Sequence, residues 1–206
     1  TAATDRPSKS LPRDTRDTLF LLAVVGWLVL VQSPHLPALT TVLAAAVLAW
    51  RLWLTLRQRP LPSGWVRFGL LALCIALTVS QFKTIVGRDA GSALVVLLLT
   101  MKTLELKARR DAFVVFFLGF FALLSHFFYS QSLLTALGIL VGVFALLTAL
   151  VNAHMPAGYP PLAQSLRMAV RMALLGMPIM VALFVLFPRF APLWGLPAQD
   201  SAKTGL

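Results

Sequence analysis

The chain has 206 residues, of which 59% are hydrophobic and only 12% are charged, and its mean hydropathy is +0.85. A soluble domain of this length needs more polar surface, so the composition excludes one and predicts a membrane protein. The formal net charge of +11 does not indicate nucleic-acid binding, because the basic residues stand singly or in short groups at the ends of apolar stretches, where they contact anionic lipid headgroups.

Seven apolar stretches follow one another along the chain, and each is predicted to be a membrane-spanning helix. They cover residues 18–32, 36–56, 65–82, 91–106, 112–130, 133–153 and 172–187. The first and the fourth are the weakest, since both are about 15 residues long and a bilayer requires ~20. The predicted fold class is all-α: a polytopic transmembrane bundle of about seven helices.

The basic residues between these stretches predict the orientation of the bundle. With the N-terminus in the cytoplasm, 14 of the 18 Lys and Arg residues lie on the cytoplasmic side. Only Lys83, Arg88, Arg189 and Lys203 are left outside, a bias that arises because basic residues resist translocation. If the fourth stretch did not cross the membrane, the ratio of cytoplasmic to external Lys and Arg residues would change from 14:4 to 10:8. We therefore keep this span and predict that the C-terminus lies outside.

The connections between the apolar stretches are too short to hold a soluble domain, so the chain is predicted to consist of three segments. Residues 1–17 are a cytoplasmic tail, residues 18–187 the helix bundle, and residues 188–206 a periplasmic linker toward a soluble domain that the chain does not contain. In the longest connection, residues 162–171 suit an interfacial amphipathic helix. Pro178 removes a backbone hydrogen bond and predicts a kink in the last helix. Because Thr1 is not an initiator methionine, we expect a fragment at both ends.

The densest polar cluster is the run Lys-Thr-Leu-Glu-Leu-Lys-Ala-Arg-Arg-Asp at residues 102–111, which includes Arg110. On a helix Lys102, Glu105 and Arg109 share a face, and Glu105 to Arg109 is a favourable i,i+4 pair. Glu105 is the only acidic residue inside an apolar stretch, so it requires a cationic partner. Asp111 stands where the fifth helix needs an N-cap. The simplest interpretation is a salt-bridged helix–turn–helix; the alternative is a cytoplasmic docking site or a proton relay.

The fifth stretch has two predicted faces. Half of the 14 Phe residues fall within it and are expected on one broad face: Phe113, Phe116, Phe117, Phe120, Phe121, Phe127 and Phe128. Opposite them run Val115, Gly119, Ala122 and His126 at helical spacing. Gly119 lets a neighbouring backbone come close, and His126 then faces the bundle rather than lipid.

A polar group that includes Tyr129 and Gln131 ends the fifth stretch near the outer interface. We interpret His126 as a hydrogen-bonded packing residue; a catalytic or ligand-binding role is the less favoured alternative, because no Cys, Asp or Glu lies at a similar depth. A bis-histidine haem would pair His126 with His35, but no other feature supports it. Neither a cofactor nor a metal site is predicted, and the lone Cys74 excludes a disulfide within the chain.

The ordered runs 102–111, 117–121 (Phe-Leu-Gly-Phe-Phe) and 125–131 (Ser-His-Phe-Phe-Tyr-Ser-Gln) resemble a known family. It is the N-terminal membrane region of the bacterial membrane-anchored transglutaminase-like proteins, the TgpA family. The resemblance continues through residues 186–197, which include Arg189, and residues 202–206. It covers most of residues 83–206, whereas residues 1–82 match only in their hydropathy pattern.

The resemblance implies a bacterial inner-membrane anchor that positions a soluble domain. In that family the bundle is followed by a periplasmic papain-like transglutaminase domain with a Cys-His-Asp triad. None of those catalytic residues has a counterpart here, so enzyme activity is expected of the parent protein, as an acyl transferase or cysteine protease, and not of this fragment. The implied partners are the lipid bilayer, the chain's own C-terminal domain, a cytoplasmic MoxR-type AAA+ ATPase and a neighbouring membrane protein.

Two other function classes remain as alternatives. A transporter or channel subunit is the first, but few residues within the spans are charged, Lys102 and Glu105 among them, and the sequence has no internal repeat. An intramembrane enzyme built around His126 and Tyr129 is the second, and it lacks a nucleophile or a metal partner.

Overall fold

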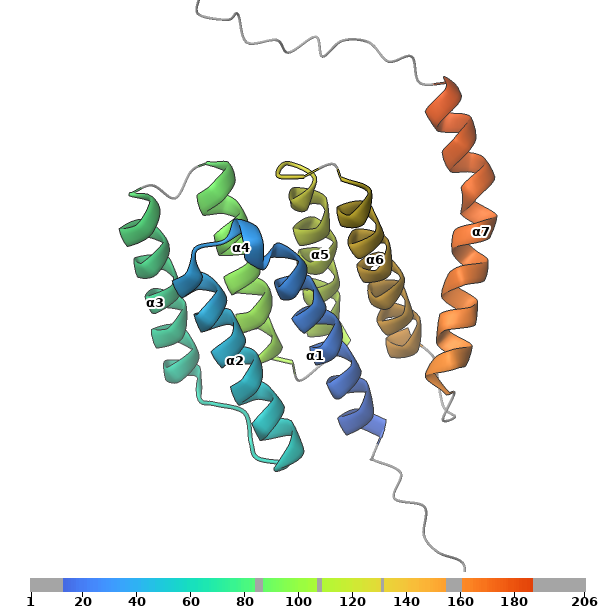
Figure 1. Ribbon diagram of the computed structural model, residues 1–206. Coiled ribbons are helices and arrows are strands. Elements are labelled where there is room, and N and C mark those ends of the chain that lie inside the picture. The colour runs from blue at the N-terminus through green and yellow to red at the C-terminus, as the bar shows by residue number, and fades with distance from the viewer. Residues whose placement is uncertain (1–12, 84–86, 107–108, 131, 155–160, 187–206) are drawn as a thin grey trace, which may run out of the picture. The chain divides into compact units, whose positions relative to one another are not determined.

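Seven α-helices and one short 3-10 helix make up the computed structural model (Figure 1) over the residues that it describes, 13–83, 87–106, 109–130, 132–154 and 161–186. The helices are α1 (Arg13–Gln32), α2 (Ala38–Leu56), α3 (Gly64–Phe82), α4 (Arg88–Thr103), α5 (Arg109–His126), α6 (Leu133–His154) and α7 (Leu162–Leu186), and the 3-10 helix η1 is Ser33–His35. These described ranges contain no strand, so the predicted all-α class and its seven helices are confirmed.

Five of the helical segments are long and apolar enough to cross a membrane. They are Thr15–His35, Ala38–Leu56, Gly64–Phe82, Leu133–His154 and Leu162–Leu186. The chain is therefore a multi-pass membrane protein. Helix α4 has 16 residues, and Asp111–His126 of α5 is also shorter than the other spans. The direction in which the helices cross the bilayer stays a prediction.

The helices fall into two compact units, which we describe separately. The first, Thr1–Val170, contains α1–α6 and the beginning of α7, and the second, Arg171–Leu206, contains the remainder of α7. Within the first unit α1 and α4 are central (Figure 1): α1 packs against α2, α4, α5 and α6, and α4 packs against α1, α2, α3 and α5. The boundaries predicted for the tail and the linker stay predictions.

The central position of α4 explains why its sequence is the weakest membrane span. More than half of its residues are buried by protein, among them Ala90, Ser92 and Ala93. Small residues at these positions let the neighbouring helices come close. The hydroxyl groups of Thr100 and Thr103 donate to the carbonyl oxygens of Leu97 and Thr100 one turn earlier, so these buried polar atoms are satisfied within α4. A helix surrounded by protein does not need the apolar exterior of one that faces lipid.

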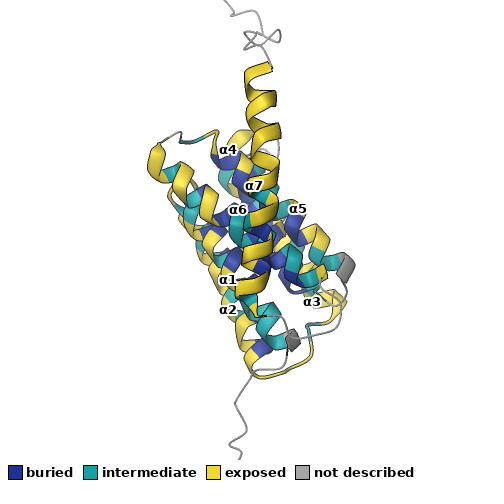
Figure 2. Cartoon of the chain, turned by 90° about the vertical axis from the view of Figure 1, so that its right-hand side faces the viewer, coloured by how far each residue is buried: buried dark blue, intermediate teal, exposed yellow. Residues whose placement is uncertain are grey.

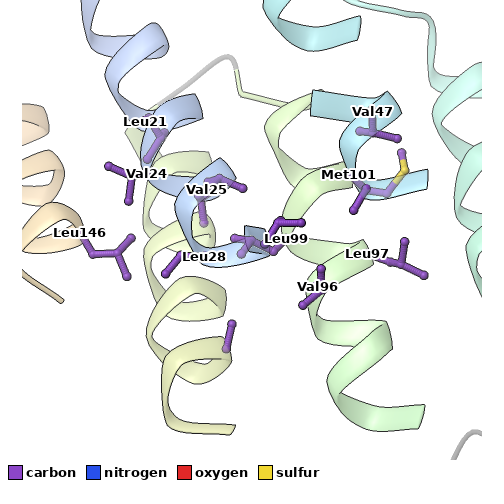
Figure 3. Close-up of a cluster of buried hydrophobic side chains, with 14 of the residues drawn as sticks. Leu21, Val24, Val25, Leu28, Val47, Val96, Leu97, Leu99, Met101 and Leu146 are labelled. Carbon is purple, nitrogen blue, oxygen red and sulfur yellow. The ribbon is translucent and has the colours of Figure 1, made fainter. Parts of the chain in front are cut away.

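The hydrophobic core of the first unit lies where α1 meets α4, α5 and α6. Figure 3 shows Val25 and Leu28 of α1 among Leu99 of α4 and Leu146 of α6. These four side chains are all less than 2% exposed. The burial pattern in Figure 2 shows the corresponding dark blue residues inside the bundle of α1–α6, with exposed residues on its outside. Burial of this core against its neighbours is what fixes the positions of the polar clusters at the helix ends.

Helix α7 begins earlier than the sequence predicts. The predicted interfacial helix 162–171 and the predicted span 172–187 form one helix, Leu162–Leu186, and Pro178 lies inside it. Near its beginning the Ser165 hydroxyl donates to Asn152 Oδ1 of α6 at 3.4 Å, and both side chains are buried. An amphipathic first part and an apolar second part therefore follow each other without a break in the helix.

Candidate functional site

Four charged side chains meet where α4 ends, and we call them the Glu105 cluster: Arg67, Lys102, Glu105 and Asp111. The Lys102 ammonium lies 2.7 Å from Glu105 Oε2 and 3.8 Å from Asp111 Oδ1. Arg67 of α3 brings one guanidinium nitrogen to within 3.7 Å of Glu105 Oε1. Glu105 thus has the cationic partner that its position in an apolar stretch requires. The cluster joins α3 and α5 to the end of α4.

Helical spacing predicts the pair Lys102–Glu105, which is observed at i,i+3, whereas the predicted pair Glu105–Arg109 stays a prediction. Helix α4 ends at Thr103, so Glu105 lies in the turn after it and has no i,i+4 partner on a continuous helix. Asp111 is not the N-cap of α5, because α5 begins at Arg109; Asp111 lies in the first turn, where a carboxylate still favours the helix dipole. The side chains of Arg109 and Arg110 lie outside the described residues. Arg67 was missed by sequence reasoning, since a contact between α3 and the end of α4 leaves no local signal.

Removing the Glu105 carboxylate is expected to have a small effect on stability. In Glu105→Ala both cations lose a partner, but each is about a quarter exposed and can reach water. The free energy of unfolding should therefore fall by no more than about 1 kcal/mol, which thermal unfolding in detergent would measure. If the variant keeps full stability but the protein loses its function in cells, the cluster is a docking site. The interpretation of the cluster as a purely structural group of salt bridges is then wrong.

A buried arginine lies at the same end of α4 as the Glu105 cluster. Arg51 of α2 is 8% exposed, and its Nε donates to the Thr103 carbonyl oxygen at 2.9 Å. Thr103 is the last residue of α4, where backbone carbonyls have no partner within the helix. A cation there also opposes the negative end of the helix dipole. Arg51 therefore caps α4 from a neighbouring helix, a role that its place in an apolar stretch did not reveal.

A second polar cluster lies at the opposite end of α4, and we call it the Tyr129 cluster: Arg88, Ser92, His35, His126 and Tyr129. The Tyr129 hydroxyl shares a hydrogen bond of 2.6 Å with the Ser92 hydroxyl and donates to the Arg88 carbonyl oxygen at 3.2 Å. The Arg88 guanidinium stacks over the Tyr129 ring, 4.8 Å from its centre.

The two histidines that a bis-histidine haem would need, His35 and His126, meet in this cluster. The His35 and His126 ring centres are 5.1 Å apart with the rings nearly perpendicular, and Tyr129 lies 5.0 Å from His35. A bis-histidine haem does not fit this geometry, because rings in edge contact leave no space for a macrocycle between them. His126 is 3% exposed, as its predicted position facing the bundle requires. The hydrogen bond expected for it is not observed at Nδ1, which has no partner among the described residues.

Replacing His126 is therefore expected to cost little. Because its buried Nδ1 forms no hydrogen bond with the described residues, His126→Leu should change the free energy of unfolding by less than about 1 kcal/mol. Gln32→Leu is the matched comparison: Gln32 is equally buried, and its Nε2 donates to the Ala122 carbonyl oxygen of the same helix α5 at 2.5 Å. Thermal unfolding in detergent should show the larger loss for Gln32→Leu. The opposite order would mean that His126 contributes a polar interaction of its own.

The predicted small-residue stripe of α5 faces the bundle. Val115, Ala122 and Gly119 are buried, and a Cβ added to Gly119 would lie 3.0 Å from two Leu146 methyl groups of α6. The Phe face is not uniformly exposed: Phe116 is 3% exposed and Phe120 is partly buried against the core, whereas Phe117 and Phe121 are exposed.

Gly142 of α6 is the counterpart of Gly119 and was missed. A Cβ there would lie 2.9 Å from a Leu123 methyl group of α5. Each helix thus places a leucine against a glycine of the other. The spacing of Gly138 and Gly142, a small residue every fourth position, is the signal that points to this contact.

Besides Arg109 and Arg110, two further candidate residues have no described side chain. Gln131 and Arg189 lie outside the described residues, so their predicted roles stay predictions. The described candidates fall into the two clusters at opposite ends of α4 and the Gly119 contact between them. In both clusters most polar groups pair with side chains or backbone carbonyls of other elements, so the arrangement holds the helix ends together. Arg67 Nε and His126 Nδ1 are the exceptions among the described residues.

Comparison with known proteins gives two matches. The sequence profile of the TgpA N-terminal domain matches residues 19–206. A protein of Pseudomonas aeruginosa named protein-glutamine gamma-glutamyltransferase is 38% identical over 182 residues. This match covers 86% of the chain but 27% of the relative, so the chain spans about a quarter of the relative's length. No solved structure matches the chain.

Proposed function

Because the chain belongs to the family of TgpA N-terminal domains, we propose that its helix bundle anchors a transglutaminase-like domain in the bacterial inner membrane and positions it on the outer side. The observation that carries the proposal is the extent of the two matches. The family profile covers residues 19–206, which contain all five long apolar segments apart from the first residues of α1. The relative is named as a transferase, and the match leaves most of its length for that activity.

The charge distribution supports the orientation in this proposal. With 14 of 18 Lys and Arg residues on the cytoplasmic side, the Glu105 cluster faces the cytoplasm and the Tyr129 cluster faces outward. The end of α7 then lies outside, where a soluble domain after residue 206 would be periplasmic. This orientation also leaves the Glu105 end accessible to a cytoplasmic partner, for which we propose the MoxR-type AAA+ ATPase that the family resemblance implies.

The packing of the first unit supports the proposal that the bundle positions the soluble domain in addition to attaching it to the membrane. Hydrogen bonds join helices at several depths: Trp27 Nε1 donates to the Gly138 carbonyl oxygen at 3.1 Å, and the Gln32 and Arg51 side chains reach α5 and α4. Such bonds between packed helices resist rearrangement inside a bilayer, where water cannot replace them. A single apolar helix would hold a soluble domain at the membrane but would leave its orientation free.

A domain exchange in the full-length Pseudomonas aeruginosa relative tests the proposal. In one chimera, residues 19–206 of this chain replace the matching region; in the control, an unrelated single-span signal anchor replaces it. We expect both proteins in the membrane fraction with the transferase part open to protease in spheroplasts, and higher transferase activity in the first. A transferase part that stays protected in the first chimera would contradict its proposed position on the outer side of the membrane. Equal activity of the two proteins would contradict the positioning role.

A further inference from the structure

A cavity of about 480 Å³ lies between α3, α4 and α5 at the end that carries the Glu105 cluster. Phe68 and Leu71 of α3, Leu98 of α4 and Leu118 of α5 give it apolar walls, and Arg67 and Lys102 line its polar end. Its volume falls in the range of about 300–1,000 Å³ that is typical of ligand sites. The cavity is therefore an apolar groove with two cations at one end.

The Arg67 guanidinium is not saturated by the protein. Its Nε is buried and has no hydrogen-bond partner among the described residues, and its contact with Glu105 is long, at 3.7 Å. Lys102, in contrast, is held by Glu105 at 2.7 Å. A guanidinium presents five donors in a planar fork that suits phosphate oxygens. Arg67 thus has donors available for an anion in the cavity.

The beginning of α3 adds to the positive character of this end. Gly64 lines the cavity and opens α3, and Ser63 before it forms no side-chain cap hydrogen bond. The first amide groups of a helix have no acceptor within the helix and favour an anion. They support the two cationic side chains, which carry the argument.

Exposed tryptophans place the polar end of the cavity at headgroup depth. Trp65, in the first turn of α3, is 86% exposed, and Trp53 near the end of α2 is half exposed. Tryptophan is enriched at the boundary between hydrocarbon and water because its ring is apolar and its N–H is polar. From that depth the apolar walls of the cavity run along α3 and α4 toward the hydrocarbon region.

We propose that this cavity binds one anionic glycerophospholipid from the bilayer, with its phosphodiester against Arg67 and Lys102 and an acyl chain along Phe68, Leu98 and Leu118. Glu105 keeps the two cations at the cavity mouth, and the three charged groups that line the cavity carry one net positive charge, which matches a single phosphodiester. Asp111, 3.8 Å from Lys102, does not line the cavity. A choline headgroup brings a cation of its own, which Arg67 and Lys102 repel. The site therefore prefers phosphatidylglycerol to phosphatidylcholine.

Native mass spectrometry of the full chain in detergent tests the proposal with these two lipids, matched in acyl chains. We expect about tenfold tighter binding of phosphatidylglycerol, and loss of this preference in Arg67→Gln, because one charge-assisted hydrogen bond is worth about that factor. The matched control is Arg59→Gln, which removes an exposed cation of the α2–α3 connection that does not line the cavity. It should change the affinity less than about twofold.

A second variant tests the acyl groove without changing any charge. Val114 lines the cavity from α5, and Val114→Phe should fill the groove and weaken phosphatidylglycerol binding even if Arg67→Gln fails to fold. Soluble glycerophosphoglycerol, which has no acyl chain, should not displace the lipid. Equal binding of the two lipids, equal losses in Arg59→Gln and Arg67→Gln, unchanged binding by Val114→Phe, or displacement by the soluble headgroup would each overturn the proposal.

Discussion

Gly142→Leu is expected to lower the free energy of unfolding by about 2–3 kcal/mol, since an added side chain in a closely packed interface forces its neighbours apart. The Cβ alone would lie 2.9 Å from Leu123 Cδ2 and 3.2 Å from Leu28 Cδ2, so the substitution affects α5 and α1 together. Gly119→Leu should act in the same way through Leu146 and Leu28. The midpoint of thermal unfolding in detergent measures both losses.

The chain offers a matched control for this overpacking. Gly69 lies in the second turn of α3, and a Cβ at this position would have no neighbour within 4 Å. Gly69→Leu makes the same chemical change on an open helix surface and should be neutral or slightly stabilising, because leucine favours a helix more than glycine does. If Gly142→Leu proves as stable as Gly69→Leu, then α5 and α6 do not pack in the way described.

Arg51→Met should cost about 2 kcal/mol, because a hydrogen bond that involves a charged group is lost and its acceptor stays buried. The Thr103 carbonyl oxygen would then lack the donor that caps α4 from α2. Methionine retains most of the apolar length of the arginine side chain, so the loss reports the polar contact rather than a cavity.

Arg59→Met is the control for Arg51→Met, since Arg59 is an exposed cation in the α2–α3 connection. Its side chain should contribute little, and the variant is expected to unfold at the temperature of the parent. A loss as large in Arg59→Met as in Arg51→Met would show that net charge, and not the contact with Thr103, determines stability at this end.

The positions of the helices could be predicted from the sequence because each apolar stretch carries its own signal. The low hydropathy of α4 also has a cause in its sequence, which only the structure makes clear. Its small and hydroxylated residues are those of a helix enclosed by protein. The exact ends could not be read in this way. Asp111 has the chemistry of an N-cap, yet α5 begins two residues earlier, at Arg109.

Contacts between distant residues were the part that sequence reasoning could not reach. Nothing local links Arg67 to Glu105 or His35 to His126, because these pairs depend on how three or more helices pack. Only one side of the contact between α5 and α6 was predicted, the stripe on α5 that contains Gly119. Gly142 on α6 could have been predicted from its spacing with Gly138, which is typical of a helix interface. Periodicity within one helix identifies a buried face but not the residue that meets it.

The orientation of the C-terminus is the central claim, and a pair of reporter fusions tests it most directly. Alkaline phosphatase, which is active only outside the cytoplasm, is fused after Leu206 in one protein and after Lys107 in the other. The 14:4 distribution of Lys and Arg predicts high activity for the fusion at Leu206 and none for the fusion at Lys107. Activity at Lys107 together with none at Leu206 would contradict the orientation, and with it the proposal that the bundle holds a transglutaminase-like domain outside the membrane.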